Sequence, residues 1–317
     1  MKKTLSLLAA LIVALMLVGC GGDDSAPAET AEAEPEAQSA PEVDVPELAM
    51  SYLENIPPNK HIVPPAEVID LLLAGEEPYI LDLRRAEDYE AGHLRGAVNI
   101  PWGSSDIYEM MKYLPTDRVV YTYCYTGQTC GQYVTFLHLI GVDARTVNLG
   151  WNRALTKHES IDEVTETGTN PIDTSVENDI PAELYSAFVD YFEEMATRNG
   201  TPFANNIVAV DAAKAIFDAE DPDVMWIDQR RAEDHTAGHI PGSVSMPYDE
   251  TFPDNVPLLP ADKRLILYCY TGQGCGQTIA MLRLMGYDAF TLNSGMGTPG
   301  TMPVGWQNQG YPVASSD

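Results

Sequence analysis

The sequence carries the same loop twice: YCYTGQTCGQ at residues 123–132 and YCYTGQGCGQ at residues 268–277. Each copy follows a run of β-branched and apolar residues and precedes a run with helical periodicity, so each places a cysteine on a strand-to-helix turn. The backbone N–H groups of such a turn and the positive end of the following helix both stabilise a thiolate. The pattern therefore predicts that Cys124 and Cys269 are nucleophilic.

The repeat extends well beyond these loops. DLRRAED at 82–88 recurs as DQRRAED at 228–234, with an offset of 146 residues, and the cysteine loops follow with an offset of 145 residues. A period of this length indicates two whole domains rather than a solenoid. The chain of 317 residues is long enough for each domain to bury its own core.

Strand and helix patterns alternate within each repeat. In the first repeat, residues 79–83, 98–100 and 119–123 are predicted to be strands, and residues 133–140 have helical periodicity. This alternation predicts the α/β class, with a parallel sheet in each domain that is flanked by helices on both faces. Active groups in such sheets gather at the carboxyl ends of the strands, where Cys124 lies.

The N-terminus has the features of an export signal. Lys2 and Lys3 precede an apolar stretch at 5–18, which is shorter than the roughly 20 residues that span a bilayer. LVGC at 17–20 resembles the lipobox of bacterial lipoproteins, which implies a signal peptide over 1–19 and lipidation of Cys20. An uncleaved anchor, or an ordinary signal peptide with a chance cysteine, is the alternative.

We therefore expect a protein that is exported and lipid-anchored to a bacterial membrane, on the periplasmic or cell-surface side. Residues 20–47 are rich in Gly, Ala, Pro, Asp and Glu and are predicted to be a disordered acidic tether. The chain has 47 acidic and 18 basic residues, with a formal net charge of −29. Such a surface repels nucleic acid and anionic headgroups, so contact with the membrane is expected through the lipid anchor only.

The cysteine spacing leaves few roles open. Of the five cysteines, Cys20 is assigned to lipid, and the other four form two C-x5-C pairs. Zinc is disfavoured because neither loop contains a histidine, so no metal site is expected. Cys130 and Cys275 are possible resolving cysteines that form a disulfide with Cys124 and Cys269, or else small buried residues that pack the helix onto the sheet.

The ordered combination of Asp-x-Arg, Gly-His-x-x-Gly-Ala/Ser and a Cys-x-x-Gly loop resembles the rhodanese (thiosulfate sulfurtransferase) family, over about residues 50–155 and again over 185–313. The resemblance implies two tandem rhodanese-like domains, each with a five-stranded parallel sheet. It also implies that Cys124 and Cys269 accept sulfane sulfur from a small donor as a persulfide and pass it to a thiol or cyanide-like acceptor. No cofactor is implied beyond this covalent intermediate.

The same resemblance assigns further residues by position. Supporting acidic and basic positions fall on Asp82, Arg84, Asp228 and Arg230. The loops that cradle the substrate comprise Tyr125, Thr126, Gly127, Gln128, Thr129, Tyr270, Thr271, Gly272, Gln273 and Gly274.

Two departures from related chemistry are informative. Classical two-domain members usually keep the cysteine in the second domain only, whereas both domains have it here. The loops also contain no cation to hold an anionic donor. Phosphatases on a related scaffold need C-x5-R to clamp the phosphoryl group. Here Cys130 and Cys275 occupy the arginine position, which argues against phosphoryl transfer.

We expect the first domain over 48–155, a linker over 156–180 and the second domain over 181–317. The favoured function is an exported, membrane-tethered sulfurtransferase. A thiol–disulfide redox module that uses the cysteine pairs and a non-catalytic sulfur-binding module are the alternatives. Thiocyanate release from cyanide would indicate the first, and reduction of a loop disulfide without sulfur transfer would indicate the second.

Overall fold

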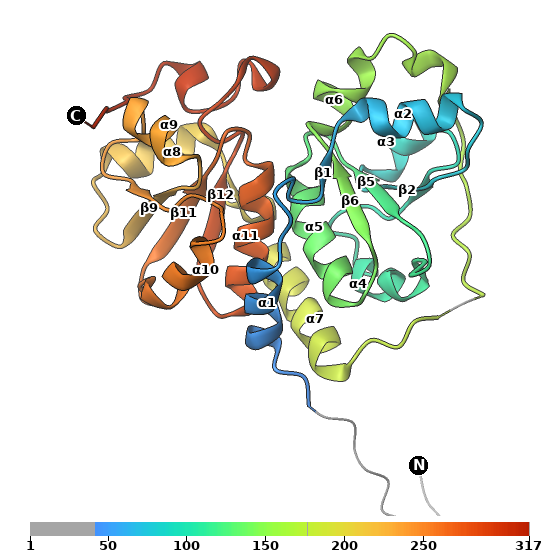
Figure 1. The fold of residues 1–317 in the computed structure, drawn as a ribbon, viewed down its shortest axis with the longest axis horizontal. Helices are drawn as coiled ribbons and strands as arrows, with labels where there is room; N and C mark the ends of the chain where they lie inside the picture. The colour runs from blue at the N-terminus through green and yellow to red at the C-terminus, as the bar shows by residue number, and fades with distance from the viewer. Residues whose placement is uncertain (1–41, 176, 317) are drawn as a thin grey trace, which may run out of the picture. The chain divides into compact units, whose positions relative to one another are not determined.

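The computed structural model describes residues 42–175 and 177–316 (Figure 1). The predicted signal peptide, Cys20 and nearly all of the predicted tether lie outside these residues. Within the described ranges, no helix combines the length and the apolar character that crossing a bilayer requires.

Two five-stranded parallel sheets form the framework. The first has the order β1 (Ile62–Val63), β6 (Ala144–Val147), β5 (Val120–Tyr123), β2 (Tyr79–Asp82) and β4 (Val98–Asn99). The second repeats this order with β8 (Ile207–Val208), β12 (Ala289–Leu292), β11 (Arg264–Tyr268), β9 (Val224–Asp228) and β10 (Val244–Ser245). The predicted α/β class with two tandem domains is confirmed.

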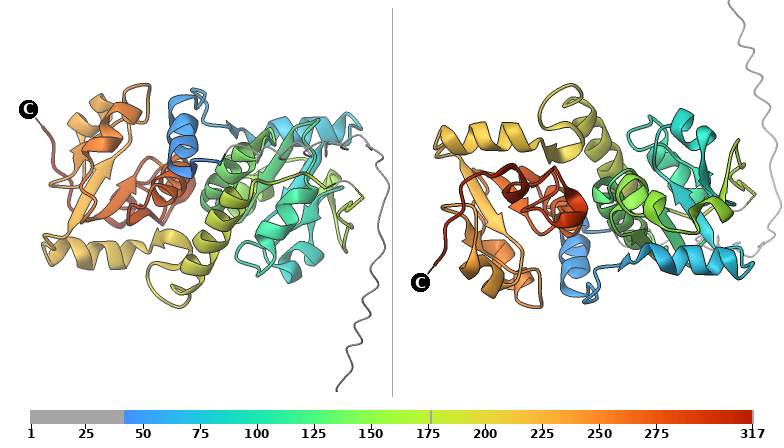
Figure 2. Two further views of the ribbon diagram at one scale, coloured as in Figure 1. Left: turned by 90° about the horizontal axis from the view of Figure 1, so that it is seen from below. Right: turned by 90° about the horizontal axis from the view of Figure 1, so that it is seen from above.

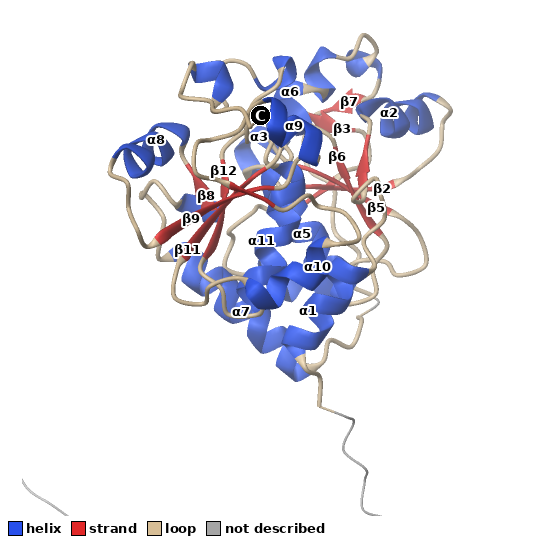
Figure 3. Cartoon of the chain, turned by 60° about the vertical axis from the view of Figure 1, so that its left-hand side comes forward, coloured by secondary structure: helices blue, strands red, loops and turns tan. Residues whose placement is uncertain are grey.

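Helices cover both faces of each sheet (Figure 3). The outer faces carry α2 (Pro65–Leu73), α3 (Ala86–Ala91) and α6 (Gly150–Arg153) in the first domain, and α8 (Val210–Asp218) and α9 (Ala232–Ala237) in the second. The inner faces meet α1 (Val45–Glu54), α4 (Ile107–Met110), α5 (Gln128–Leu139), α7 (Ala182–Ala196), α10 (Phe252–Asn255) and α11 (Gln273–Leu284). The alternation of side chains along each strand supplies one apolar layer to each face.

The inner faces of the two sheets share one hydrophobic core. Its centre is the pair α5 and α11, which lie side by side between the sheets (Figure 1). Two glycines permit this approach: a Cβ on Gly276 would lie 2.7 Å from the carbonyl oxygen of Gln128, and one on Gly131 would lie 2.5 Å from that of Gln273. The first turns of the two cysteine helices therefore pack backbone against backbone.

Helices α1 and α7 complete this shared core (Figure 2). On α7, one apolar stripe is buried: Leu184, Phe188, Tyr191 and Met195. Helix α1 begins earlier than the predicted end of the tether, at Val45, because the Asp44 carboxylate accepts the Glu47 N–H at 2.9 Å and caps the helix. Ala49 and Leu53 of this helix are buried in the shared core.

Part of the segment predicted as a linker folds onto the first domain. Strand β7 (Thr165–Glu166) pairs antiparallel with β3 (His93–Leu94), and Val164 is buried in the outer core of this domain. These contacts fix the His93 turn, since the His93 ring also lies 3.4 Å from a Glu166 carboxylate oxygen. The His93 Nδ1 atom also lies 2.8 Å from the Tyr89 carbonyl oxygen, so the His93 ring stabilises this turn through its hydrogen bonds.

Candidate active site

The two cysteines end equivalent central strands. Cys124 follows β5 and is only 2% exposed, and Cys269 follows β11 and is only 7% exposed. The chain then turns through Gly127 and Gly272, with φ of 88° and 81°, a conformation that glycine adopts without strain, and enters α5 and α11. This turn directs the Gly127 N–H to the Cys124 sulfur at 3.1 Å.

The surroundings of Cys124 favour its thiolate. Burial opposes ionisation, but hydrogen bonds from the Cys130 thiol, the Thr129 hydroxyl and the backbone N–H groups of Cys130 and Thr126 outweigh it and lower the pKa of Cys124 to about 6. Each of these bonds places a donor on the sulfur, and charge-assisted bonds of this kind are about twice as strong as neutral ones. Near neutral pH the thiolate is therefore the main form.

Cys269 is more acidic. The Cys275 thiol bonds to its sulfur, and although burial acts in the opposite direction, the Cys275 N–H, the charge of Lys60 and the Thr271 N–H bring the pKa of Cys269 down to about 5. The structure thus brings both predicted nucleophiles into thiolate-stabilising turns.

Cys130 and Cys275 occupy the first turns of α5 and α11, and both are fully buried free thiols in the structure. Burial and the adjacent thiolate raise the pKa of each of them well above its ordinary value. Each pair therefore consists of one ionised and one protonated sulfur in hydrogen-bond contact.

The loop glutamines reach into the opposite domain. The Ser294 N–H donates to Gln128 Oε1 at 3.0 Å, and Gln128 Nε2 donates to the Leu292 carbonyl at 3.2 Å. In the reverse direction, the Leu149 N–H donates to Gln273 Oε1 at 3.1 Å. These amides are buried at the domain interface, so each cysteine loop is hydrogen-bonded to the opposite domain.

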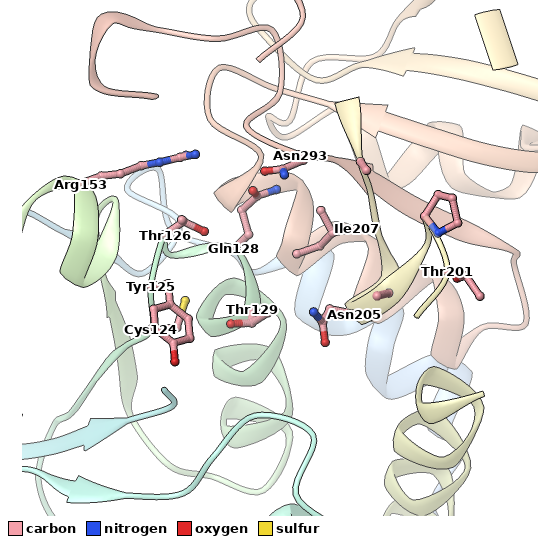
Figure 4. Close-up of a pocket in the computed structure, with 13 residues that line it drawn as sticks. Cys124, Tyr125, Thr126, Gln128, Thr129, Arg153, Thr201, Asn205, Ile207 and Asn293 are labelled. Atoms are coloured by element: carbon pink, nitrogen blue, oxygen red, sulfur yellow. The ribbon is translucent and has the colours of Figure 1, made fainter. Parts of the chain in front are cut away.

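A cavity of about 350 Å³ adjoins Cys124 (Figure 4). The first domain contributes the cysteine loop and Arg153 of α6, and Figure 4 shows the Arg153 side chain extending over the cavity. The opposite wall comes from residues 201–209 and Asn293 of the second domain. Of the predicted loop residues, Tyr125, Thr126, Gln128 and Thr129 line this cavity.

The predicted supporting residues form buried ion pairs beside the strand ends. Arg84 Nη2 lies 2.6 Å from Asp82 Oδ2 and also donates to the Gly92 carbonyl at 2.7 Å. Asp228 and Arg230 repeat this pair at 2.7 Å. The Nε and Nη2 groups of both arginines donate to the aspartate and to the turn carbonyl, so both arginines stabilise the strand end and the following turn.

The loop tyrosines are anchored by their hydroxyl groups. Tyr125 donates to the carboxylate of Asp88, and Tyr270 donates to that of Asp234. These two hydrogen bonds fix the loop tyrosines to α3 and α9, which contain Asp88 and Asp234. Tyr270 remains 38% exposed and forms part of the surface beside Cys269.

The comparison with protein families agrees with this geometry. The model of the Rhodanese-like domain matches twice, at residues 64–156 and 209–297, which together make up more than half of the chain. The chain belongs to the rhodanese-like family. This membership supports a sulfur-transfer-related function for the protein.

Relatives of this rhodanese-like protein match it in part. The tRNA uridine(34) hydroxylase of Erwinia tasmaniensis is 29% identical over 75 residues, 22% of this chain and 21% of the relative. That of Salmonella arizonae is 31% identical over 91 residues, 27% of this chain and 26% of the relative. The chain thus spans about a quarter of the length of these curated relatives. The solved thiosulfate sulfurtransferase of Pseudomonas aeruginosa is 20% identical, with 79% of this chain and 46% of that chain covered and a TM-score of 0.31.

Sequence reasoning missed two cations of this rhodanese-like protein, because neither lies in a cysteine loop. Arg153 borders the Cys124 cavity, and its Nη1 is buried without a hydrogen-bond partner among the described residues. Burial lowers the pKa of Arg153, while the charge of Cys124 acts in the opposite direction. The second cation is Lys60, from the segment before β1, whose charge lowers the pKa of Cys269. The sequence does contain a signal for these two cations. In the other repeat, the positions of Arg153 and Lys60 are occupied by Thr298 and Asn205, so each cation is specific to one repeat.

Proposed function

We propose that the chain is a sulfurtransferase in which Cys124 and Cys269 each carry sulfane sulfur as a persulfide. The observation that supports this most directly is the pair of buried thiols whose pKa values fall to about 6 and about 5. A thiolate is the form that attacks sulfur, and the same N–H groups can stabilise the charge of a persulfide.

The reaction has two balanced halves. The cysteine thiolate attacks the outer sulfur of a small donor, a new S–S bond forms, the donor S–S bond breaks, and its electron pair leaves with the donor remnant. A thiol or cyanide-like acceptor then attacks the terminal sulfur of the persulfide, and the cysteine leaves again as a thiolate. No cofactor beyond this covalent intermediate is needed.

The place of action is part of the same proposal. The LVGC sequence at 17–20 supports export and lipid anchoring at a bacterial membrane through Cys20. The net charge of −29 argues against a nucleic-acid substrate for this chain, although its two partial relatives are tRNA uridine(34) hydroxylases.

A second candidate is thiol–disulfide exchange, which the contact of each reactive sulfur with a second thiol favours. A persulfide on Cys124 would be attacked by Cys130, giving the 124–130 disulfide and hydrogen sulfide. An external dithiol would then return both cysteines to thiols.

Turnover with cyanide tests the first function against the second. Wild-type protein, supplied with thiosulfate or an alkyl hydropersulfide, is expected to release thiocyanate, and the double variant Cys124→Ser/Cys269→Ser is expected to release none. A Cys130→Ala/Cys275→Ala variant, which retains both nucleophiles, is the control. If wild-type protein shows only reduction of a loop disulfide and no thiocyanate, the redox function replaces the proposed one.

A further inference from the structure

Each cysteine site is bordered by a residue from the other domain. Lys60 precedes β1 and Asn205 precedes β8, and both residues have left-handed backbone conformations, with φ of 55° and 62°. The Lys60 carbonyl accepts from Gln277 of α11 at 2.5 Å, and the Asn205 carbonyl accepts from Gln132 of α5 at 2.9 Å. The same kind of hydrogen bond, from a glutamine side chain to a backbone carbonyl, therefore holds each residue against the cysteine helix of the other domain.

The two side chains have different chemistry in equivalent places. The side-chain Oδ1 of Asn205 accepts the indole N–H of Trp102 at 3.1 Å. In the other site, the Lys60 ammonium lies 4.4 Å from the ring centroid of Tyr248, which follows β10 as Trp102 follows β4. An aromatic face holds a cation without neutralising it.

The second site also has room for this lysine. A Cβ added to Gly274 would lie 3.5 Å from Lys60 Cδ, 4.0 Å from its Nζ and 3.9 Å from the Cys269 sulfur. The first domain has Thr129 at the equivalent position. The branches of a threonine at 274 would compete for the space that the lysine chain occupies, so Gly274 and Lys60 fit as a pair.

The ammonium group is available for a ligand. None of the ion pairs within 42–175 and 177–316 includes Lys60, although acidic residues outnumber basic ones by 47 to 18 in the whole chain. A cation kept free beside a reactive sulfur is suited to an anion that approaches this sulfur.

We propose that Lys60 determines the donor specificity of the Cys269 site by binding the oxyanion end of the sulfur donor, so that the second site depends on a residue of the first domain. The inference rests on the proposed function. With thiosulfate, the Cys269 thiolate attacks the outer sulfur, the bond to the sulfonate sulfur breaks, and its electron pair leaves as sulfite. The ammonium of Lys60 faces the charge that the leaving sulfite carries.

The test isolates the second site in a Cys124→Ser background. Lys60→Gln removes the charge, Lys60→Arg keeps it, and Lys157→Gln removes an exposed lysine elsewhere as a matched control. Donor selectivity is measured at neutral pH as the ratio of kcat/KM for thiosulfate to that for an alkyl hydropersulfide, which has no oxyanion. Lys60→Gln is expected to lower this ratio on the order of tenfold, mainly through KM for thiosulfate, because a charge-assisted contact is lost. Lys60→Arg should retain most of it, and Lys157→Gln should leave it unchanged.

The outcomes separate this inference from the proposed function. Equal loss with both donors, or an unchanged ratio in Lys60→Gln, would overturn the role of Lys60 while leaving sulfur transfer intact. If no variant takes up sulfur from either donor, the proposed function fails. The anion site at Lys60 is then tested separately, by asking whether sulfite protects Cys269 from alkylation. Sulfite should slow alkylation of Cys269 by uncharged iodoacetamide when Lys60 is present but not in Lys60→Gln, and equal protection in both would overturn the anion site.

Discussion

The two cysteine sites share one backbone and differ in where their charges come from. Both have a strand end, a glycine turn and a helix that begins with the loop, yet the Cys124 site has Arg153 from its own domain, and the Cys269 site has Lys60 from the other domain. In the other repeat, Thr298 stands at the position of Arg153, and Asn205 stands at the position of Lys60. The two repeats therefore share the turn that stabilises a thiolate, while the nearby cation belongs to the same domain in one site and to the other domain in the second.

Removal of the nucleophiles should give the largest effect. Cys124→Ser and Cys269→Ser are each expected to abolish the turnover of their own site, by about 1,000-fold or more, because a hydroxyl at this position is not ionised. Thiocyanate release by each single variant then reports the share of the other site. If Cys124→Ser leaves turnover untouched while Cys269→Ser abolishes it, the first site is structural and only the second is catalytic.

Disruption of the helix contact should weaken both domains together. In Gly276→Ala, a Cβ at 2.7 Å from the Gln128 carbonyl oxygen forces α5 and α11 apart. The free energy of unfolding is expected to fall by about 1–3 kcal/mol, as for other overpacked sites. Ser186→Ala, on an exposed position of α7, is the matched control and should change it by less than about 0.5 kcal/mol. Denaturant titration measures both, and equal values for the two variants would contradict the close approach.

The buried glutamines should couple the two sites. Gln128→Ala leaves the Ser294 N–H without its acceptor, at a cost of about 1–3 kcal/mol. Ser294 precedes the turn in which the Met296 N–H donates to the Cys269 carbonyl at 2.8 Å. We therefore expect Gln128→Ala to slow alkylation of Cys269, in the domain that was not mutated. A change confined to Cys124 would show that the loops act independently.

The two cysteines should also differ in the pH dependence of their alkylation. Reactivity follows the thiolate, so it should rise with pH through a midpoint at about 6 for Cys124 and about 5 for Cys269, measured in the opposite serine variants. Cys275→Ala removes a donor to Cys269 and should raise its midpoint by about one unit. Midpoints near the ordinary thiol value of about 8.5 in the unmodified sites would contradict the proposed environment.

Much of the fold could be predicted from the sequence because it depends on local patterns. The predicted strand at 119–123 matches β5 at Val120–Tyr123, and the predicted helical periodicity at 133–140 overlaps α5 at Gln128–Leu139. Helix α1 was not predicted, because its burial comes from contacts with helices of both domains and not from its own short pattern.

The site was predictable only where chemistry and loop coincide. Cys124 and Cys269 follow from the repeated turn, but the roles of Gln128 and Gln273 at the interface depend on the opposite domain. Lys60 is separated from Cys269 by most of the chain, so its place beside the sulfur follows from the packing of the two domains.

The most direct test of the two-site account is the mass of each loop peptide after the protein has been exposed to thiosulfate or an alkyl hydropersulfide and then blocked with an alkylating agent. The account predicts a gain of one sulfur atom on the peptide with Cys124 and on the peptide with Cys269. Each gain should disappear in the matching serine variant and persist in Cys130→Ala/Cys275→Ala. Sulfur on one peptide only, or on neither, would contradict it.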